Sequence, residues 1–285
     1  MKTNRLPNFL IVGTMKSGTS SLADYLSEHV DIHIPNKEVH YFNNDINYNK
    51  GFSWYEAQLF KDFDEDSKSN HPIVGEKTPT YSYQPNCVDR IKETVPEVKL
   101  IWIFRNPVKR SFSNYIHAVR KGAEPLSFNE CVKNEELLIR DNMFRGYVER
   151  SKYSDQVERF LEKFDLNNMH FLLFEDLIRE PKKELNKIAD FLGVPNFKNI
   201  KTVHSNKTKL PKRTTKLGET FGGLDGFLYK IIRRMNLKLA HDIFIDQLTL
   251  SQKNSAELAH KFKPYNQRLS ELTGLDLSVW DEKNL

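Results

Sequence analysis

The chain has 285 residues, of which 39% are hydrophobic and 28% charged, and its formal net charge at neutral pH is +5. These values are typical of a globular protein with a sizeable core and exclude a small disulfide-stabilised scaffold. The two cysteines, Cys87 and Cys131, have no metal-ligand spacing, so we expect both to be reduced and buried. The apolar run before Gly13 is too short for a signal peptide or a membrane span, and no later run is long enough. We therefore expect a cytoplasmic protein.

The first predicted elements are a buried strand from Phe9 to Val12, a glycine-rich turn and the start of a helix. Gly13 and Gly18 occupy the glycine positions of the nucleotide-binding pattern G-x-x-x-x-G-K-[ST], but Thr19 stands where that pattern has lysine. The basic residue of the loop is instead Lys16. Amides at a helix start favour an anion wherever the lysine lies, so we expect a phosphate-binding loop with a displaced positive charge.

Alternating strands and helices follow along the chain. Two further apolar runs, from Lys99 to Phe104 and from His170 to Phe174, are typical of parallel strands that are covered on both faces. Helical spacing of apolar residues predicts helices around Leu22, from Val157 to Phe164, from Pro181 to Gly193 and from Ser255 to Leu272. This pattern predicts a single α/β domain over residues 1–285 with a P-loop-like, doubly wound central parallel sheet flanked by helices.

Two segments near the C-terminus are predicted to lie outside this sheet. Residues 196–225 have no regular pattern and include seven Lys or Arg but no Asp or Glu between Lys198 and Leu217, so we expect a basic loop or lid that faces an anion. Residues 251–285 are expected to form a C-terminal helix and tail. No aromatic platform or DNA-binding module accompanies the basic run, so nucleic acid is not expected as the partner.

Five motifs, in order along the chain, resemble those of sulfotransferases that use 3′-phosphoadenosine 5′-phosphosulfate (PAPS). They are TMKSGTSSL, KEVHYF, NYNKGFSWY, GEKTPTYSY and IFRNPVKRSFSNYIH. The second, third and fourth are similar to the branch that sulfates glycosaminoglycans such as heparan sulfate. The resemblance covers residues 9–191. It implies a bacterial-type enzyme that transfers a sulfuryl group, releases 3′-phosphoadenosine 5′-phosphate (PAP) and needs no metal.

The resemblance also implies roles for individual residues. The glycine loop, with Lys16, Ser17, Gly18, Thr19 and Ser20, would bind the 5′-phosphosulfate, and Lys16 would also offset the charge of the leaving group. Glu38 would be the catalytic base, with His40 as the rival base or its orienting partner, because both would face one side of an extended segment. Lys77 would lie beside the transferred group.

The 3′ phosphate of the donor would be held by a second set of residues. Arg105, at the end of a predicted strand, and Ser113, eight positions later, match the 3′-phosphate motif of the family. The segment HSNKTKLPKR resembles the family's second 3′-phosphate segment but lacks its glycine, which leaves the choice between Lys212 and Arg213 open. The family's frequent C-terminal cysteine pair is absent after Cys131, which points away from a secretory compartment.

The acceptor is predicted less sharply than the donor. Aromatic residues at Phe42, Phe52, Trp54 and Tyr55 either belong to the core or border an acceptor cleft. We expect a carbohydrate-like hydroxyl or amine acceptor, with a lipid, a phenol or a small alcohol as alternatives. More remote alternatives are a P-loop kinase and a non-catalytic anion-binding or nucleic-acid-binding protein. The oligomeric state does not follow from the sequence.

Overall fold

The structure is a computed structural model that describes residues 6–63, 72–200 and 250–281. Its contacts divide the chain into two compact units. Unit 1 comprises Met1–Arg105, Tyr153–Ser205 and Gln267–Val279, and unit 2 comprises Asn106–Lys152, Asn206–Asn266 and Trp280–Leu285. The prediction of a single domain over residues 1–285 stays a prediction.

Unit 1 is built on a five-stranded sheet in the order β2-β3-β1-β4-β5, and every pair of neighbouring strands is parallel. The strands are β1 (Phe9–Gly13), β2 (Ile32–His33), β3 (Ile73–Lys77), β4 (Lys99–Phe104) and β5 (Met169–Leu173). Three of them were predicted, with β5 shifted by one residue, because Phe174 begins a helix instead.

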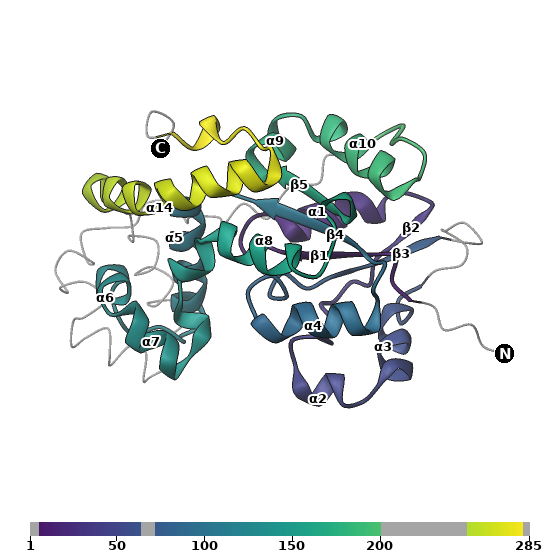
Figure 1. Ribbon diagram of the computed structural model, residues 1–285, viewed down its shortest axis with the longest axis horizontal. Coiled ribbons are helices and arrows are strands. Elements are labelled where there is room, and N and C mark those ends of the chain that lie inside the picture. The colour runs from purple at the N-terminus through teal and green to yellow at the C-terminus, as the bar shows by residue number, and fades with distance from the viewer. Residues whose placement is uncertain (1–5, 64–71, 201–249, 282–285) are drawn as a thin grey trace. The chain divides into compact units, whose positions relative to one another are not determined.

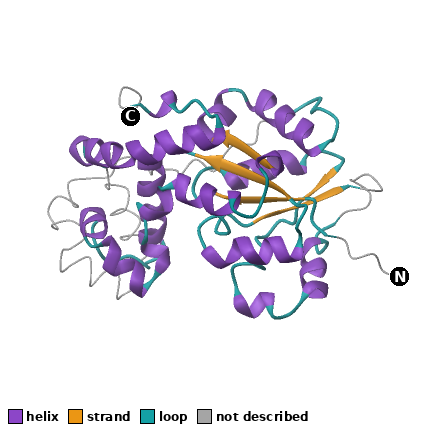
Figure 2. Ribbon diagram, in the orientation of Figure 1, coloured by secondary structure: helices purple, strands orange, loops and turns teal. Residues whose placement is uncertain are grey.

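Helices cover both faces of this sheet, as Figures 1 and 2 show. The helices of unit 1 are α1 (Thr19–Ser27), α2 (Asp45–Tyr48), α3 (Phe52–Leu59), α4 (Pro85–Thr94), α8 (Tyr153–Leu161), η3 (Leu166–Asn168), α9 (Phe174–Arg179) and α10 (Pro181–Leu192). On one face Ile11 and Ile103 pack with side chains of α1, α9 and α10, and on the other the Trp102 ring meets Phe160 of α8 edge to face at 4.9 Å. The predicted doubly wound α/β fold is therefore confirmed.

Local sequence signals explain where several of these helices begin and end. Pro181 opens α10, and Gly193 closes it in a left-handed conformation with φ 80°, as predicted. Phe164 was predicted to extend the helix that begins near Val157, but α8 ends at Leu161.

Unit 2 is helical in the residues that the structure describes. It contains α5 (Pro107–Arg120), α6 (Phe128–Lys133), α7 (Glu135–Asp141), η1 (Met143–Arg145) and η2 (Glu149–Ser151); α14 (Gln252–Thr273) and η4 (Ser278–Trp280) each continue across the boundary between the units. Asn106 caps α5, as its Asn-Pro sequence predicts, by accepting hydrogen bonds from the amides of Val108 and Lys109. The core of unit 2 joins Tyr115 and Phe128 to Phe262 of α14.

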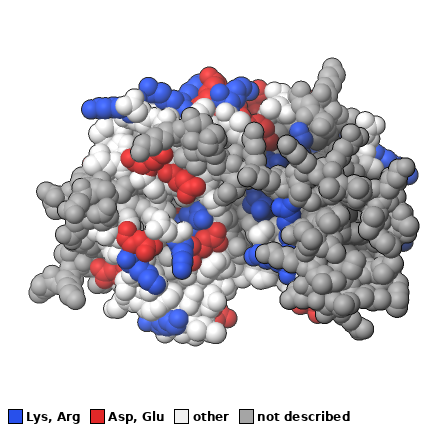
Figure 3. All heavy atoms as spheres, turned by 180° about the vertical axis from the view of Figure 1, so that it is seen from behind, with Lys and Arg blue, Asp and Glu red and all other residues white. Residues whose placement is uncertain are grey.

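The surface carries charged side chains of both signs (Figure 3), and the two cysteines are buried. Basic and acidic side chains both lie on the face in Figure 3, and several Lys and Arg side chains gather near its middle. Cys87 and Cys131 are buried free thiols, as predicted. None of the helices in the described residues combines the length and apolar character that crossing a bilayer requires. The cytoplasmic location stays a prediction.

Candidate active site

The order of the strands places two loops at a switch point of the sheet. From β1 the chain continues toward β2, beyond β3, whereas from β4 it continues to β5 on the opposite side. Loops that diverge in this way leave a crevice at the carboxyl ends of the strands, where open α/β sheets bind ligands. The loop after β1 carries Lys16, and the residue directly after β4 is Arg105.

The loop after β1 is held firmly against β4. The amide of Thr14 donates to the carbonyl of Ile103 at 2.9 Å, and the hydroxyl of Thr14 lies 2.6 Å from that of Ser17. Gly18 then caps α1 with φ 91°, and a Cβ atom there would lie 2.5 Å from the Phe174 ring. Only glycine fits this close approach without strain.

The start of α1 is suited to an anion. Gly18 has no side chain that could cap the helix, and the first turn of α1 contains no acidic residue. The first amides of a helix have no intrahelical acceptor, so those that follow Gly18 are open to a phosphate or sulfate group. Ser20 is exposed in this first turn, whereas Ser17 and Thr19 are buried.

Arg105 lies beside this loop. Its guanidinium donates to the carbonyl of Lys16 at 3.2 Å and stacks over the Phe174 ring at 5.0 Å. The hydroxyl of Tyr153 donates to the Arg105 carbonyl at 2.9 Å. Burial lowers the pKa of Arg105, although the arginine remains a cation at neutral pH. The structure therefore brings together the glycine loop and Arg105, the first of the two residues of the motif that are predicted to bind the 3′ phosphate.

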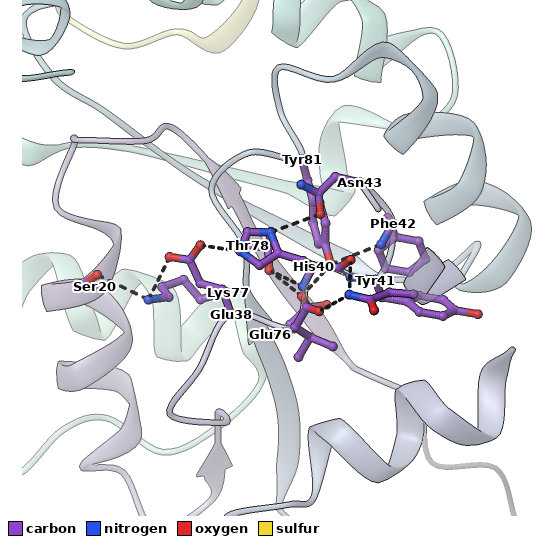
Figure 4. A network of polar contacts seen from close by, with 12 residues as sticks. Ser20, Glu38, His40, Tyr41, Phe42, Asn43, Glu76, Lys77, Thr78 and Tyr81 are labelled. Carbon is purple, nitrogen blue, oxygen red and sulfur yellow. Dashed lines mark hydrogen bonds and ion pairs between the residues drawn. The ribbon is translucent and has the colours of Figure 1, made fainter. Parts of the chain in front are cut away.

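A cluster of charged side chains lies next to the same loop (Figure 4). Glu38 is half-buried, and its two carboxylate oxygens face different partners: His40 Nε2 at 3.3 Å and Lys77 Nζ at 3.4 Å. Lys77 Nζ also donates to the Ser20 hydroxyl in the first turn of α1 at 3.3 Å. Lys77 thus connects the carboxylate to the first turn of α1.

The neighbours of Glu38 set its charge. Partial burial acts to raise the pKa of Glu38, but the hydrogen bond with His40 and the charge of Lys77 together lower it below its ordinary value. The same hydrogen bond raises the pKa of His40. At neutral pH Glu38 is therefore a carboxylate that can accept a proton. Among the residues with described positions, no group of three or more His, Cys, Asp and Glu could hold a metal ion.

The sequence suggested that the segment carrying this cluster is extended, but its backbone departs from that conformation at one residue. His40 has φ 54°, in the left-handed region that non-glycine residues seldom adopt. Its Nδ1 lies 3.2 Å from Asn43 Oδ1, on the opposite side of the ring from Glu38. The two side chains lie beside each other, as expected, although the backbone at His40 is left-handed rather than extended.

Comparison with known proteins identifies the family. The sequence model of the family described as "Sulfotransferase domain" matches residues 6–219. The chain belongs to this sulfotransferase family. It is 27% identical over 281 residues to heparan sulfate glucosamine 3-O-sulfotransferase 3A1 of Mus musculus, covering 98% of this chain and 65% of that protein. It is also 31% identical over 208 residues to the 3B1 protein of Homo sapiens, covering 73% of this chain and 51% of that one. The chain thus spans about half to two thirds of these relatives.

A solved structure supports the same family. The crystal structure of a sulfotransferase from Alicyclobacillus acidocaldarius matches with a TM-score of 0.68 and 27% sequence identity, covering 96% of this chain and 98% of that one. The resemblance to PAPS-dependent sulfotransferases that the ordered motifs indicated is confirmed, and with it the P-loop-like fold.

Other predicted residues of this sulfotransferase-family chain belong to unit 2 or fall outside the described residues. Ser113 lies on α5 in unit 2, whereas Arg105 lies in unit 1. Lys212 and Arg213, and most of the predicted lid at 196–225, fall outside the described residues. Their roles stay predictions.

The aromatic cluster divides into core and surface residues. Phe42 and Tyr55 are fully buried, and the Tyr41 and Tyr55 rings stack at 4.3 Å. Trp54 is only partly buried, with Lys50 Nζ 4.4 Å from its ring centroid. Of the four aromatic residues named from the sequence, the partly buried Phe52 and Trp54 therefore remain candidates for contact with an acceptor, whereas Phe42 and Tyr55 belong to the core.

Sequence reasoning missed the buried polar residues behind the cluster. Glu76 precedes Lys77 in β3 and is fully buried, and Thr78 and Tyr81 follow it within the motif GEKTPTYSY. A carboxylate inside a short apolar strand, followed by two hydroxyl residues, is the signal that could have revealed them. Such a carboxylate must find hydrogen-bond donors once it is buried.

Proposed function

We propose that this protein transfers a sulfuryl group from PAPS to a hydroxyl or amine of a carbohydrate acceptor. The observation that carries the proposal is the position of Lys77, whose Nζ lies 3.4 Å from Glu38 and 3.3 Å from Ser20. One cation therefore contacts both a candidate base and the turn that is suited to the donor's sulfate. The names of the relatives make heparan sulfate the first acceptor to test.

The residues of the glycine loop fit the 5′-phosphosulfate group. Lys16 and the amides after Gly18 offer positive charge to an anion, and Gly18 lets the loop pass close to Phe174. Arg105, fixed to the Lys16 carbonyl, would hold the 3′ phosphate with Ser113 and with Lys212 or Arg213. The bound donor supplies the sulfuryl group and its leaving phosphate.

The chain's own groups would divide the work of the transfer. Glu38 accepts the proton of the acceptor hydroxyl as that oxygen forms a bond to sulfur. The bond from sulfur to the bridging oxygen breaks, and its electron pair stays on the phosphate of PAP, where Lys16 and Lys77 offset the charge. Glu38 then releases the proton to water. His40, which is hydrogen-bonded to Glu38, orients it and is the alternative base.

The first experiment tests the donor site by calorimetric titration of PAP without metal. Wild type and two variants are compared: Lys16→Ala, and Lys187→Ala as a matched control from the exposed surface of α10. We expect tight binding to wild type and the control, and a loss of at least about tenfold in Lys16→Ala, since a charged hydrogen bond contributes about 1.5–3 kcal/mol. A preference for ATP with magnesium would contradict the proposal and favour a kinase.

The second experiment tests turnover with heparan sulfate as acceptor. We expect Glu38→Gln to lose turnover while its affinity for PAP stays that of wild type, because the amide cannot accept the proton. Parallel reactions with a phenol, a small alcohol and a lipid alcohol test the alternative acceptors. Donor binding without turnover on any acceptor would favour a non-catalytic anion-binding protein.

A further inference from the structure

Behind the charged cluster lies a carboxylate that the proposed reaction does not use. Glu76 is fully buried in β3, and three hydroxyls donate to it. Tyr55 reaches one carboxylate oxygen at 2.5 Å, while Thr78 at 2.7 Å and Tyr81 at 2.6 Å share the other. The three donors come from α3 and from the loop after β3.

Two of these hydroxyls continue the network to the backbone of the His40 segment (Figure 4). The Thr78 hydroxyl accepts from the His40 amide at 3.4 Å. The Tyr81 hydroxyl accepts from the Tyr41 amide at 2.9 Å and from the Phe42 amide at 3.4 Å. Three consecutive amides are therefore connected to the Glu76 carboxylate, the first through the Thr78 hydroxyl and the next two through the Tyr81 hydroxyl. Tyr55 makes no such connection among the hydrogen bonds described.

The backbone held in this way, the turn at residues 39–42, would not persist without these hydrogen bonds. His40 has φ 54°, a conformation that costs a non-glycine residue free energy and persists only when its surroundings hold it. Asn47 Nδ2 also donates to the carbonyls of Val39 and His40 at 3.3 and 3.2 Å. Amides and carbonyls of the turn are thus both fixed, and the turn sets the 3.3 Å contact between Glu38 and His40.

Stability alone does not explain a carboxylate at this position. Removing a carboxylate from water is costly, and an apolar side chain of similar size commonly serves a core equally well or better. What an apolar residue could not do is orient the Thr78 and Tyr81 hydroxyls, because a hydroxyl that donates to the carboxylate turns its lone pairs toward the backbone amides.

We propose that Glu76 is a positioning residue for sulfuryl transfer: through the Thr78 and Tyr81 hydroxyls it fixes the turn that presents Glu38 and His40. The inference rests on the proposed function for its catalytic consequence. Its structural part, that the hydroxyls determine the order of this turn, stands separately and can be measured without any acceptor.

The test uses a matched pair of variants, Tyr81→Phe and Tyr55→Phe. Each removes one phenol hydroxyl that donates to Glu76 from a fully buried ring, but only the Tyr81 hydroxyl also accepts from the turn. Denaturant unfolding measures the loss of stability in each variant, and we expect the larger loss in Tyr81→Phe, because that hydroxyl makes three hydrogen bonds and the Tyr55 hydroxyl makes one. Any difference between them at the active site then arises from the connection to the turn.

Three measurements are made on this pair. In Tyr81→Phe we expect the Tyr41 amide to exchange its hydrogen about tenfold faster, the loss of one net hydrogen bond. We expect the pKa of His40, followed by NMR, to move back toward the ordinary value of 6.5. We expect kcat with heparan sulfate to fall by about 100-fold, the effect of a misplaced catalytic group, with an unchanged Kd for PAP. Tyr55→Phe should leave all of these near wild type.

The outcomes separate this inference from the proposed function. Equal changes in the two variants, or a Tyr81→Phe variant with wild-type exchange and wild-type His40 pKa, would overturn the positioning role of Glu76. If wild type sulfates no acceptor, the proposed function fails, while the exchange and NMR results still decide whether the network holds the turn.

Discussion

The pH dependence of turnover distinguishes the two candidate bases. Glu38 and His40 contact each other, and that contact moves their pKa values apart: the pKa of Glu38 lies below 4.5 and the pKa of His40 above 6.5. A general base works only in its unprotonated form. The rate is therefore lost as pH falls through the pKa of whichever group is the base, and the two possibilities predict different pH ranges.

The size of the difference follows from these directions. At about pH 5.5, one unit below 6.5, His40 is unprotonated in less than about a tenth of the molecules, whereas Glu38 is ionised in more than about nine tenths. If Glu38 is the base, kcat changes little between about pH 7 and 5.5. If His40 is the base, kcat falls by at least about eightfold over that range.

The assay measures kcat for heparan sulfate with saturating donor, and calorimetry with PAP at each pH separates titration of the donor's 3′ phosphate from that of the protein. The variant His40→Asn is the control, because asparagine tolerates the left-handed backbone at this position. It removes two interactions that lower the pKa of Glu38 together with the ring that orients the carboxylate, so its acid limb should move to higher pH and its kcat at neutral pH should fall without being abolished. An eightfold loss in wild type, with no activity in His40→Asn, would refute Glu38 as the base.

Two further predictions concern stability. Gly18→Ala should cost about 2–4 kcal/mol in denaturant unfolding and weaken PAP binding, because its Cβ atom would meet the Phe174 ring. The control is Gly193→Ala, which has the same sign of φ but no neighbour within 4 Å and should cost only about 1 kcal/mol. Equal losses in the two variants would contradict this explanation. Glu124→Ala should destabilise the protein by about 3 kcal/mol in thermal unfolding, because this fully buried carboxylate accepts two hydrogen bonds from Arg145. A measured loss below about 1 kcal/mol would show that the pair contributes little to stability.

Some of the fold was predictable from the sequence because its signals are local. The apolar runs of β1 and β4, the glycine turn before α1 and the Asn-Pro start of α5 each depend on neighbouring residues alone. By contrast, β3 was not predicted, since Glu76 interrupts its apolar run and Gly75 has a low strand propensity. That glycine is required because a Cβ there would lie 2.1 Å from the Phe9 ring in the neighbouring strand, a contact between distant residues.

The candidate site was predictable to a similar extent. The motifs identified Lys16, Glu38, His40, Lys77 and Arg105, and the structure places all of them in unit 1. The left-handed backbone at His40 was not foreseen, because the hydroxyls that bind the His40 and Tyr41 amides lie 38 and 40 residues away in the sequence. No spacing rule reports such partners before the strands are paired.

The register of β3 explains how one short strand serves both the core and the site. Successive side chains of a strand point to opposite faces, so Glu76 and Lys77 cannot share an environment. Pairing of Leu10 with Glu76 and of Ile11 with Lys77 turns the carboxylate inward to its hydroxyl donors and brings the ammonium beside Ser20. A slip of one residue would exchange them, burying an ammonium group, which cannot accept a hydrogen bond, where the carboxylate now accepts three, and removing the cation from Glu38. The cost of that exchange means that the buried network enforces the register that places Lys77 in the site.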